Sequence, residues 1–110
     1  MAQRRMITKS LMNDRHFLQL SRDAQMLLVA AIVHADDEGI VDIDPLISLL
    51  KMPGTQPLSE LIECRLLVML PKPGRRIVWI RDWDKTNHVQ PSRFVKSVYH
   101  DLKLEALRSL

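Results

Sequence analysis

The chain has 110 residues, of which 46% are hydrophobic and 26% are charged, and its formal net charge is +3. This length favours a single domain, and the composition excludes a disordered chain. The single cysteine, Cys64, excludes an internal disulfide framework and fits a reducing, cytoplasmic setting. The longest apolar run, residues 26–33, is too short to span a membrane, and no apolar core of a secretion signal follows the first arginines.

The charges are distributed unevenly along the chain. Residues 1–22 carry five basic residues against one acidic residue, and residues 71–100 carry seven against two. Residues 23–70 carry eight acidic residues against two basic ones. Two basic segments around an acidic middle indicate an anionic partner. For any single charge, a solvated surface position is the simpler interpretation.

The first third of the chain predicts one dominant helix. Residues 1–20 are expected to form an N-terminal arm with one short helix. Residues 21–35 predict a longer helix, because the Ser21 hydroxyl can accept a hydrogen bond from an amide of the first turn. Since this helix is apolar on most sides, we expect it at the centre of the core. The acidic residues 36–39 that follow lack the spacing of a calcium-binding loop, so they predict a solvated turn, with Gly39 in a left-handed conformation.

The middle of the chain predicts a helix-turn-helix. Asp44 is expected to cap a helix that Pro45 opens, because proline at the first helical position loses no hydrogen bond. The Pro-Gly pair at residues 53–54 ends this helix, and Pro57 lies in the first turn of the next. The outward side of the second helix is polar and is formed by Gln56, Ser59, Glu60 and Glu63.

Two short β-rich runs, residues 68–70 and 77–80, flank a turn whose Pro-Gly pair is typical of a hairpin. A short strand is also expected at residues 40–41, between the first and second helices. Trp79 is expected to anchor the hairpin to the helices. Cys64 is expected to be a small core residue.

This order of elements predicts a mainly α fold with a small antiparallel β-hairpin, a winged helix-turn-helix. Residues 1–110 are expected to form a single winged-helix domain. It consists of the arm and short helix over residues 1–20, a core over residues 21–83 and a C-terminal extension over residues 84–110. The extension is expected to contain a turn or extended link at residues 89–93 and a terminal helix at residues 97–107.

The residue patterns indicate a protein that is not an enzyme and needs no cofactor. The three glycines fall in separate turns and form no phosphate-binding loop, and no Gly-x-Ser-x-Gly motif is present. The histidines lack the spacing of a metal site. They are His16, His34, His88 and His100.

DNA binding is the function that the pattern favours. The second helix of a helix-turn-helix enters the major groove, where glutamine can read adenine. The two glutamates of this helix are unfavourable near phosphates, so the basic tip of the hairpin is better placed to hold the backbone or reach the minor groove. The alternative is a protein–protein module whose wing charges are solvated. The expected DNA-contacting residues are Arg4, Arg5, Gln56, Ser59, Lys72, Arg75, Arg76, Arg93 and Lys96.

Four groups of residues match one known family in order. They are RMITK at residues 5–9 with Asp14 and FL at 17–18, LS at 20–21 with AQ at 24–25, ADDEGIV at 35–41, and IVWIRDW at 77–83 followed by Asn87. With these groups the chain resembles the N-terminal domain of phage replisome organisers, the replication-initiation proteins of phages and prophages in Gram-positive bacteria. The resemblance implies a winged helix in the cytoplasm of a bacterial host that binds double-stranded origin DNA and self-associates. It also implies recruitment of the host helicase or its loader.

Two departures limit what the resemblance implies. Members of this family continue into a second domain with the helicase-loading contacts, so this chain is expected to be a fragment or a short relative. Residues 56–66 share the family's apolar positions but few identities, so no DNA sequence preference is carried over. An oligomerisation or adaptor module of the replication machinery and a winged-helix transcription regulator stay open as alternatives.

Overall fold

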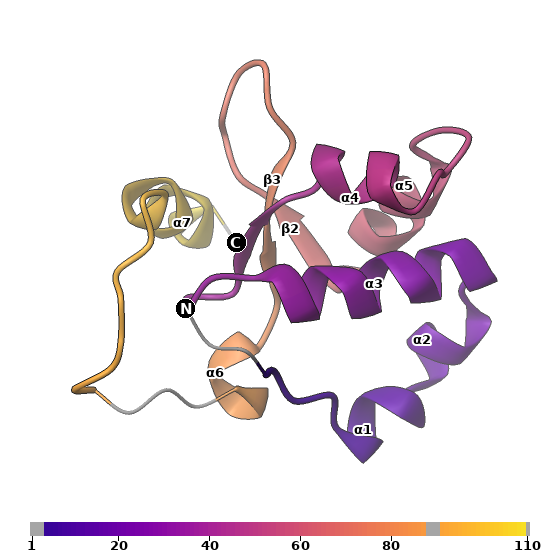
Figure 1. The fold of residues 1–110 in the computed structure, drawn as a ribbon, viewed down its shortest axis with the longest axis horizontal. Coiled ribbons are helices and arrows are strands. Elements are labelled where there is room, and N and C mark those ends of the chain that lie inside the picture. Colours follow the sequence, from indigo (N-terminus) through magenta and orange to yellow (C-terminus); the bar gives the residue numbers. More distant parts are fainter. Residues whose placement is uncertain (1–3, 88–90, 110) are drawn as a thin grey trace.

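The computed structural model describes residues 4–87 and 91–109, and these form seven helices and one three-stranded antiparallel sheet (Figure 1). The mainly helical class with a small antiparallel sheet is therefore confirmed. Residues 88–90, which include His88 and the start of the expected link, lie outside the described residues. The helices are α1 (Lys9–Met12), α2 (Arg15–Gln19), α3 (Arg22–His34), α4 (Asp44–Leu49), α5 (Gln56–Glu63), α6 (Trp83–Thr86) and α7 (His100–Arg108). The strands are β1 (Ile40–Asp42), β2 (Leu67–Met69) and β3 (Ile77–Ile80).

The sheet contains one strand more than the expected hairpin. Its order is β1-β3-β2, and both outer strands run antiparallel to β3. Ile40 of β1 lies opposite Trp79, and Leu67 of β2 lies opposite Ile80. The short strand at residues 40–41 was expected, but its pairing with the hairpin was not. The element order α3-β1-α4-α5-β2-β3 is compatible with a winged helix.

The main core lies between the sheet and the helices α3 and α5. The cap of α3 is confirmed, because the Ser21 hydroxyl oxygen accepts a hydrogen bond from the amide of Ala24 at 3.1 Å. Leu27 and Leu28 of α3 are fully buried. The expected place of α3 in the core is confirmed for this inner face. Its outer face is open, and Met26 and Val33 are 53% and 51% exposed.

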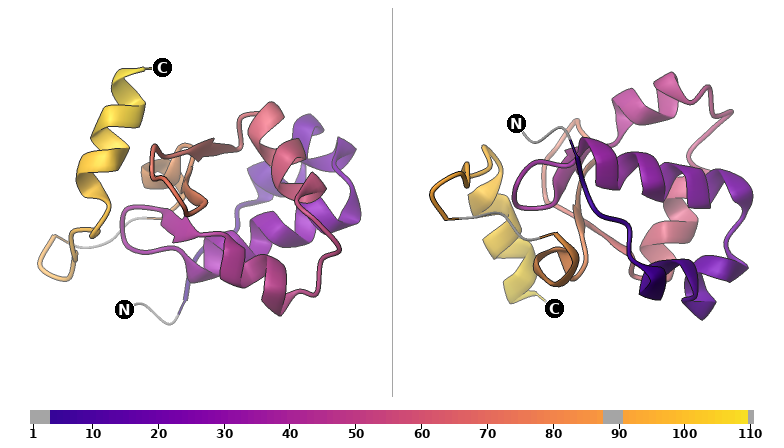
Figure 2. Two further views of the ribbon diagram at one scale, coloured as in Figure 1. Left: turned by 90° about the horizontal axis from the view of Figure 1, so that it is seen from above. Right: turned by 60° about the horizontal axis from the view of Figure 1, so that its bottom comes forward.

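The opposite face of the sheet is covered by α7 (Figure 2). As a result, the two tryptophans belong to different apolar clusters. Trp79 packs on this face beside Tyr99 and Leu102. The expectation that it anchors the hairpin to the helices of the main core is therefore wrong. Successive side chains of a strand point to opposite faces, so Trp79 of β3 faces α7 while Val78 and Ile80 face the helices. Trp83 is instead the fully buried tryptophan of the main core.

Local capping rules fail at α4. Proline lies in the first turn as expected, but the N-cap is Ile43, and no side chain caps the helix. The Asp44 carboxylate accepts a hydrogen bond from Arg76 at 2.7 Å, so a partner distant in sequence takes the group that was expected to cap. Helix α5 likewise begins with a proline in its first turn and without a side-chain cap. Cys64, at the end of α5, is only half-buried and is not a core residue.

No helix among the described residues has both the length and the apolar character needed to cross a membrane.

Candidate nucleic-acid interface

One of the two carboxylates expected on the outward face of α5 is bound to the residue that caps α3. Gln56 and Ser59 are exposed, as expected for residues that face a partner. The Glu60 carboxylate, however, turns toward the start of α3 and accepts hydrogen bonds from the hydroxyl (2.6 Å) and the amide (3.0 Å) of Ser21. These two bonds hold the pKa of Glu60 below its usual range. Glu63 alone therefore remains as an exposed carboxylate on this face.

The loop between β2 and β3, residues 70–76, projects beyond α4 as a wing (Figure 1). Its cations Lys72, Arg75 and Arg76 are all exposed. Arg76 is bonded to Asp44, and the Arg75 guanidinium lies 3.7 Å from the Asp42 carboxylate. Both arginines are thus drawn back toward the base of the wing. Within the described part of the chain, Lys72 forms no ion pair.

An open hollow of about 340 Å³ joins α5 to the wing. Ser59 of α5 and Arg76 of the wing both line it, together with Glu63. A neighbouring hollow of about 330 Å³ is lined by Asp44, Arg75 and Arg76. Of the expected residues, Ser59, Arg75 and Arg76 therefore line these two hollows, which share Arg76, whereas Gln56 and Lys72 are exposed but line neither.

Arg5 does not belong to this region, and the expectation that it contacts DNA is wrong in this structure. Its side chain is only 4% exposed. The guanidinium donates to the carbonyl oxygen of Ala35 at 3.1 Å and to the Asp37 carboxylate at 2.9 Å. It also lies 5.3 Å from the centre of the Trp83 ring. Because the Arg5 guanidinium is buried and already paired with Asp37, a DNA phosphate cannot reach it in this conformation.

The remaining predicted cations, Arg4, Arg93 and Lys96, are exposed. The N-terminal arm and the segment before α7, which carry them, lie toward the end of the sheet away from the wing (Figure 1). The segment that carries Arg93 and Lys96 is attached to the acidic turn, because the amide of Val95 donates to Asp37 at 2.9 Å. The acidic turn precedes the end of β1 that lies farthest from the wing. The nine predicted residues therefore divide into a wing group, a distant group and the buried Arg5.

The acidic turn at residues 36–39 is buried and structural, where a solvated turn had been expected. Glu38 is 4% exposed and accepts a hydrogen bond from the Ser97 amide at 2.7 Å. The Nδ1 atom of His100 lies 2.6 Å from the same carboxylate, and the Lys103 ammonium lies at 3.6 Å. Asp37 joins the N-terminal arm to the segment before α7. The turn therefore fastens both ends of the chain to the core.

The pKa values of both buried carboxyls lie below their usual range. Burial opposes ionisation of Asp37, but the hydrogen bonds from Arg5 and from the Val95 amide outweigh it. Burial likewise opposes ionisation of Glu38, and the contacts with His100, Ser97 and Lys103 outweigh it. Both groups are therefore charged near neutral pH. In the sequence, the dense run of acidic residues before Gly39 was the only indication of these buried carboxyls.

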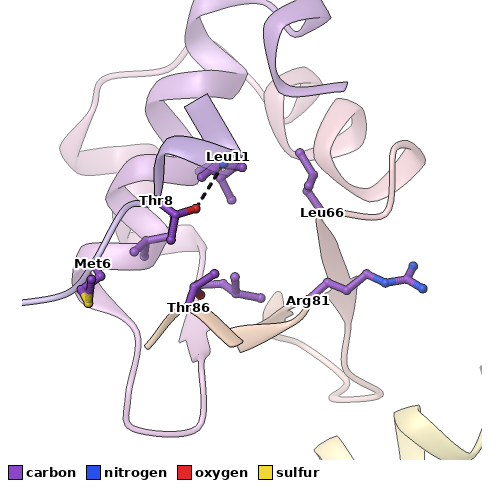
Figure 3. A pocket seen from close by; sticks show the side chains of 9 residues that line it. Met6, Thr8, Leu11, Leu66, Arg81 and Thr86 are labelled. Atoms are coloured by element: carbon purple, nitrogen blue, oxygen red, sulfur yellow. Dashed lines mark hydrogen bonds between the residues drawn. The ribbon is translucent and has the colours of Figure 1, made fainter. Parts of the chain in front are cut away.

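An enclosed pocket of about 60 Å³ lies between the N-terminal arm and the main core (Figure 3). Its lining includes Met6, Leu11 and Leu66, with Thr8, Thr86 and Arg81 as polar residues. A pocket of this size holds only a few water molecules. No three His, Cys, Asp or Glu residues of the described chain lie together as a metal site.

Two exposed arginines were not predicted as site residues. Arg65 follows α5, and Arg81 follows β3. Both line a hollow of about 440 Å³ beside β2. The positive φ of Arg65, 64°, is set by the turn after α5 and cannot be read from the sequence.

Comparisons of the chain with protein-family models, curated proteins and solved structures found no match.

Proposed function

We propose that this chain is a winged-helix DNA-binding domain in which α4 and α5 form the helix-turn-helix and residues 70–76 form the wing. The observation that carries the proposal is a pair of hollows that share Arg76 and place the exposed Ser59 of α5 beside Arg75 and Arg76 of the wing. The element order and the sheet order β1-β3-β2 support the fold assignment.

The geometry suggests a division of roles on double-stranded DNA. Gln56 and Ser59 lie in the first half of α5, where a recognition helix meets base edges in the major groove. Lys72, Arg75 and Arg76 would contact phosphates or enter the minor groove. The Asp44 carboxylate that now binds Arg76 would be replaced by a phosphate, a second anion with the same hydrogen-bonding geometry.

The biological setting is proposed from the resemblance to phage replisome organisers. In that setting the domain binds origin DNA in the cytoplasm of a bacterial host and helps to recruit the helicase or its loader. A winged-helix transcription regulator would use the same surface on an operator. The replication role rests on the ordered residue groups that the chain shares with the family, including ADDEGIV at residues 35–41 and IVWIRDW at 77–83.

The outer face of α3 favours self-association as a second candidate function. Met26 and Val33 stand exposed on this face, with Val29 and Ala30 half-buried beside them. Two copies of α3 crossing antiparallel about a twofold axis would place Met26 of each copy against Val33 of the other. The same axis would place Val29 against Ala30. The stripe is therefore self-complementary at helical spacing.

A titration of a labelled DNA duplex at several salt concentrations tests the proposed DNA binding. The wild type should show a log–log salt slope of roughly −0.9 for each phosphate that it neutralises. In the triple variant Lys72→Ala, Arg75→Ala, Arg76→Ala, the magnitude of this slope should fall by up to the contribution of about three phosphates. Undetectable binding of the wild type at low salt would contradict the proposal.

A charge-matched control separates the wing from non-specific attraction. The control variant carries Lys9→Ala, Lys85→Ala and Arg108→Ala, three exposed cations outside the wing. Both triple variants lower the net charge from +3 to zero. If both lose affinity equally, the wing has no special role in DNA binding.

Light scattering tests the second candidate function. Met26→Glu should shift an oligomer toward the monomer mass of 12.8 kDa. Leu18→Glu, at an equally exposed leucine of α2, should leave the mass unchanged. A monomeric wild type at high concentration would exclude this interface.

A further inference from the structure

The two edges of the sheet differ in how their backbone groups are satisfied. At the β1 edge, the Asp36 amide donates to the carbonyl oxygen of Ile40 at 3.0 Å. The Asp36 carboxylate in turn accepts a hydrogen bond from the Ile40 amide, also at 3.0 Å. The acidic turn therefore covers this edge at the end of the sheet away from the wing.

No backbone hydrogen bond from the described residues covers the β2 edge, although Ser109, which follows α7, lines the hollow beside it. The amide of Arg81 donates to the carbonyl oxygen of Leu66, and the amide of Leu70 donates to the carbonyl oxygen of Ile77. In an antiparallel ladder, alternate residues point their backbone groups away from the partner strand. The N–H and C=O groups of Leu67 and Met69 therefore point outward, and no other hydrogen bond in the described part of the chain ends on them.

A hollow of about 440 Å³ lies along this open edge. The strand β2 forms one wall, and Ile62 at the end of α5 contributes an apolar surface next to it. Met69 is 40% exposed here, although most side chains of the sheet are buried. An extended chain placed in the hollow would meet free backbone donors and acceptors together with apolar side chains.

The charge beside the hollow is positive. Arg65 and Arg81 both line it and are exposed, and neither forms an ion pair within the described part of the chain. Figure 3 shows the Arg81 side chain extending away from the enclosed core pocket. No carboxylate of the described residues lines the hollow. The ligand that complements this surface is therefore acidic.

We propose that the β2 edge binds an extended acidic segment of a partner protein, which adds to the sheet as a fourth strand. In this mode of recognition the main-chain hydrogen bonds supply affinity, and side-chain pockets supply specificity. Here the outward N–H and C=O groups of Leu67 and Met69 form the main-chain hydrogen bonds. Arg65 and Arg81 select a peptide that carries carboxylates. The free strand edge and its apolar surroundings favour a peptide over a nucleic acid. The inference does not depend on DNA binding, since the hollow includes none of the wing cations.

Nuclear magnetic resonance of the ¹⁵N-labelled chain tests the proposal with a hexapeptide of alternating glutamate and valine. The peptide should shift the amide signals of Leu67 and Met69 and slow their hydrogen exchange. A matched peptide with lysine in place of glutamate should bind at least about tenfold more weakly, since two charge pairs are lost. Absence of shifts at millimolar peptide, or equal binding of the lysine peptide, overturns the proposal.

Two kinds of variant locate the peptide on the edge. Met69→Pro removes an outward N–H that the ladder does not use, and proline is tolerated on edge strands in such positions. It should weaken binding about tenfold, whereas Met69→Ala should change it by less than about threefold. Equal effects of the two substitutions contradict strand addition.

The paired variant Arg65→Asn, Arg81→Gln leaves the strand backbone unchanged, and asparagine tolerates the positive φ at position 65. It should also weaken binding about tenfold and remove most of its salt dependence. Unchanged binding of this variant contradicts the selection of carboxylates. A DNA duplex that shifts the amides of Arg65 and Arg81, while the acidic peptide does not, would reassign the surface to phosphate binding and overturn the proposal.

Discussion

Replacing Asp37 by asparagine is expected to destabilise the fold more than any exposed substitution. The Asp37 carboxylate accepts hydrogen bonds from the Arg5 guanidinium and from the Val95 amide, both at 2.9 Å. The side chains of Asp37 and Arg5 are 8% and 4% exposed. An asparagine offers one acceptor oxygen, so one of the two donors would face an NH₂ group. The guanidinium would also lose its counter-charge while it stays buried.

Removing one partner of a buried ion pair costs roughly 3–5 kcal/mol, because the other charge is left uncompensated. Arg5 would keep its hydrogen bond to the Ala35 carbonyl and its position over the Trp83 ring. A cation over an aromatic ring contributes up to about 2 kcal/mol when desolvated, so the expected loss for Asp37→Asn is near the lower end, about 3 kcal/mol. A domain of this size has a free energy of unfolding of about 5–15 kcal/mol, and a loss of about 3 kcal/mol lowers the Tm by roughly 10 °C or more.

Urea denaturation followed by tryptophan fluorescence measures this loss directly. Asp101→Asn, at an exposed aspartate in the first turn of α7, is the matched control and should stay within about 0.5 kcal/mol of the wild type. The double variant Arg5→Met, Asp37→Leu should be more stable than Asp37→Asn alone, because it leaves no unpaired buried charge at these two positions. A loss for Asp37→Asn within about 1 kcal/mol of the control would refute the reasoning.

Three further outcomes follow from individual contacts. Gly39→Ala should lower the free energy of unfolding by at least about 3 kcal/mol, because the φ of Gly39 is +80° and a Cβ would lie 2.4 Å from Trp83. Gly74→Ala is the control in thermal unfolding: its φ is +79° but the space around it is open, so the loss should be only about 1–2 kcal/mol. Asp44→Asn should strengthen DNA binding up to about fivefold in an anisotropy titration, because it frees Arg76 from an exposed ion pair; weaker binding would contradict the wing contact. The lowered pKa of Glu38 contributes stability that is complete above the pKa of the unfolded chain and lost as the pH falls through the folded value. Glu38→Gln should therefore flatten the fall in unfolding free energy as the pH drops below 4.5, the ordinary pKa of a glutamate. Parallel pH profiles of this variant and the wild type would contradict that linkage.

Elements with local signals could be predicted from the sequence. The Ser21 cap marks the start of α3, and prolines in the first turns mark α4 and α5. The Pro-Gly turn separates β2 from β3 within one or two residues of the expected positions. Hydrogen bonds to neighbouring residues and fixed backbone angles determine such features, so a short window of sequence contains the necessary information.

Features set by distant partners could not be predicted. Asp44 has the sequence context of a cap, yet Arg76, 32 residues away, takes its carboxylate. Arg5 looked like a free cation of the arm, but Asp37 holds it inside the fold. The pairing of β1 with β3 is another contact between remote segments.

The same distinction applies to the candidate site. Gln56, Ser59 and the three wing cations are exposed, and Ser59, Arg75 and Arg76 line neighbouring hollows, as the predicted helix-turn-helix and hairpin implied. Whether a given exposed cation lies near the wing depends on where the two ends of the chain are hydrogen-bonded to the core. The acidic turn binds the segment that carries Arg93 and Lys96, and so holds these two residues at the far end of the sheet.

Mapping a DNA duplex onto the ¹⁵N-labelled chain by amide chemical shifts tests the proposed function most directly. The proposal predicts shifts at Gln56, Ser59 and residues 72–76, which weaken as salt is added. Shifts confined to the surface around Arg4, Arg93 and Lys96, or no shifts at low salt, would contradict DNA binding by α5 and the wing.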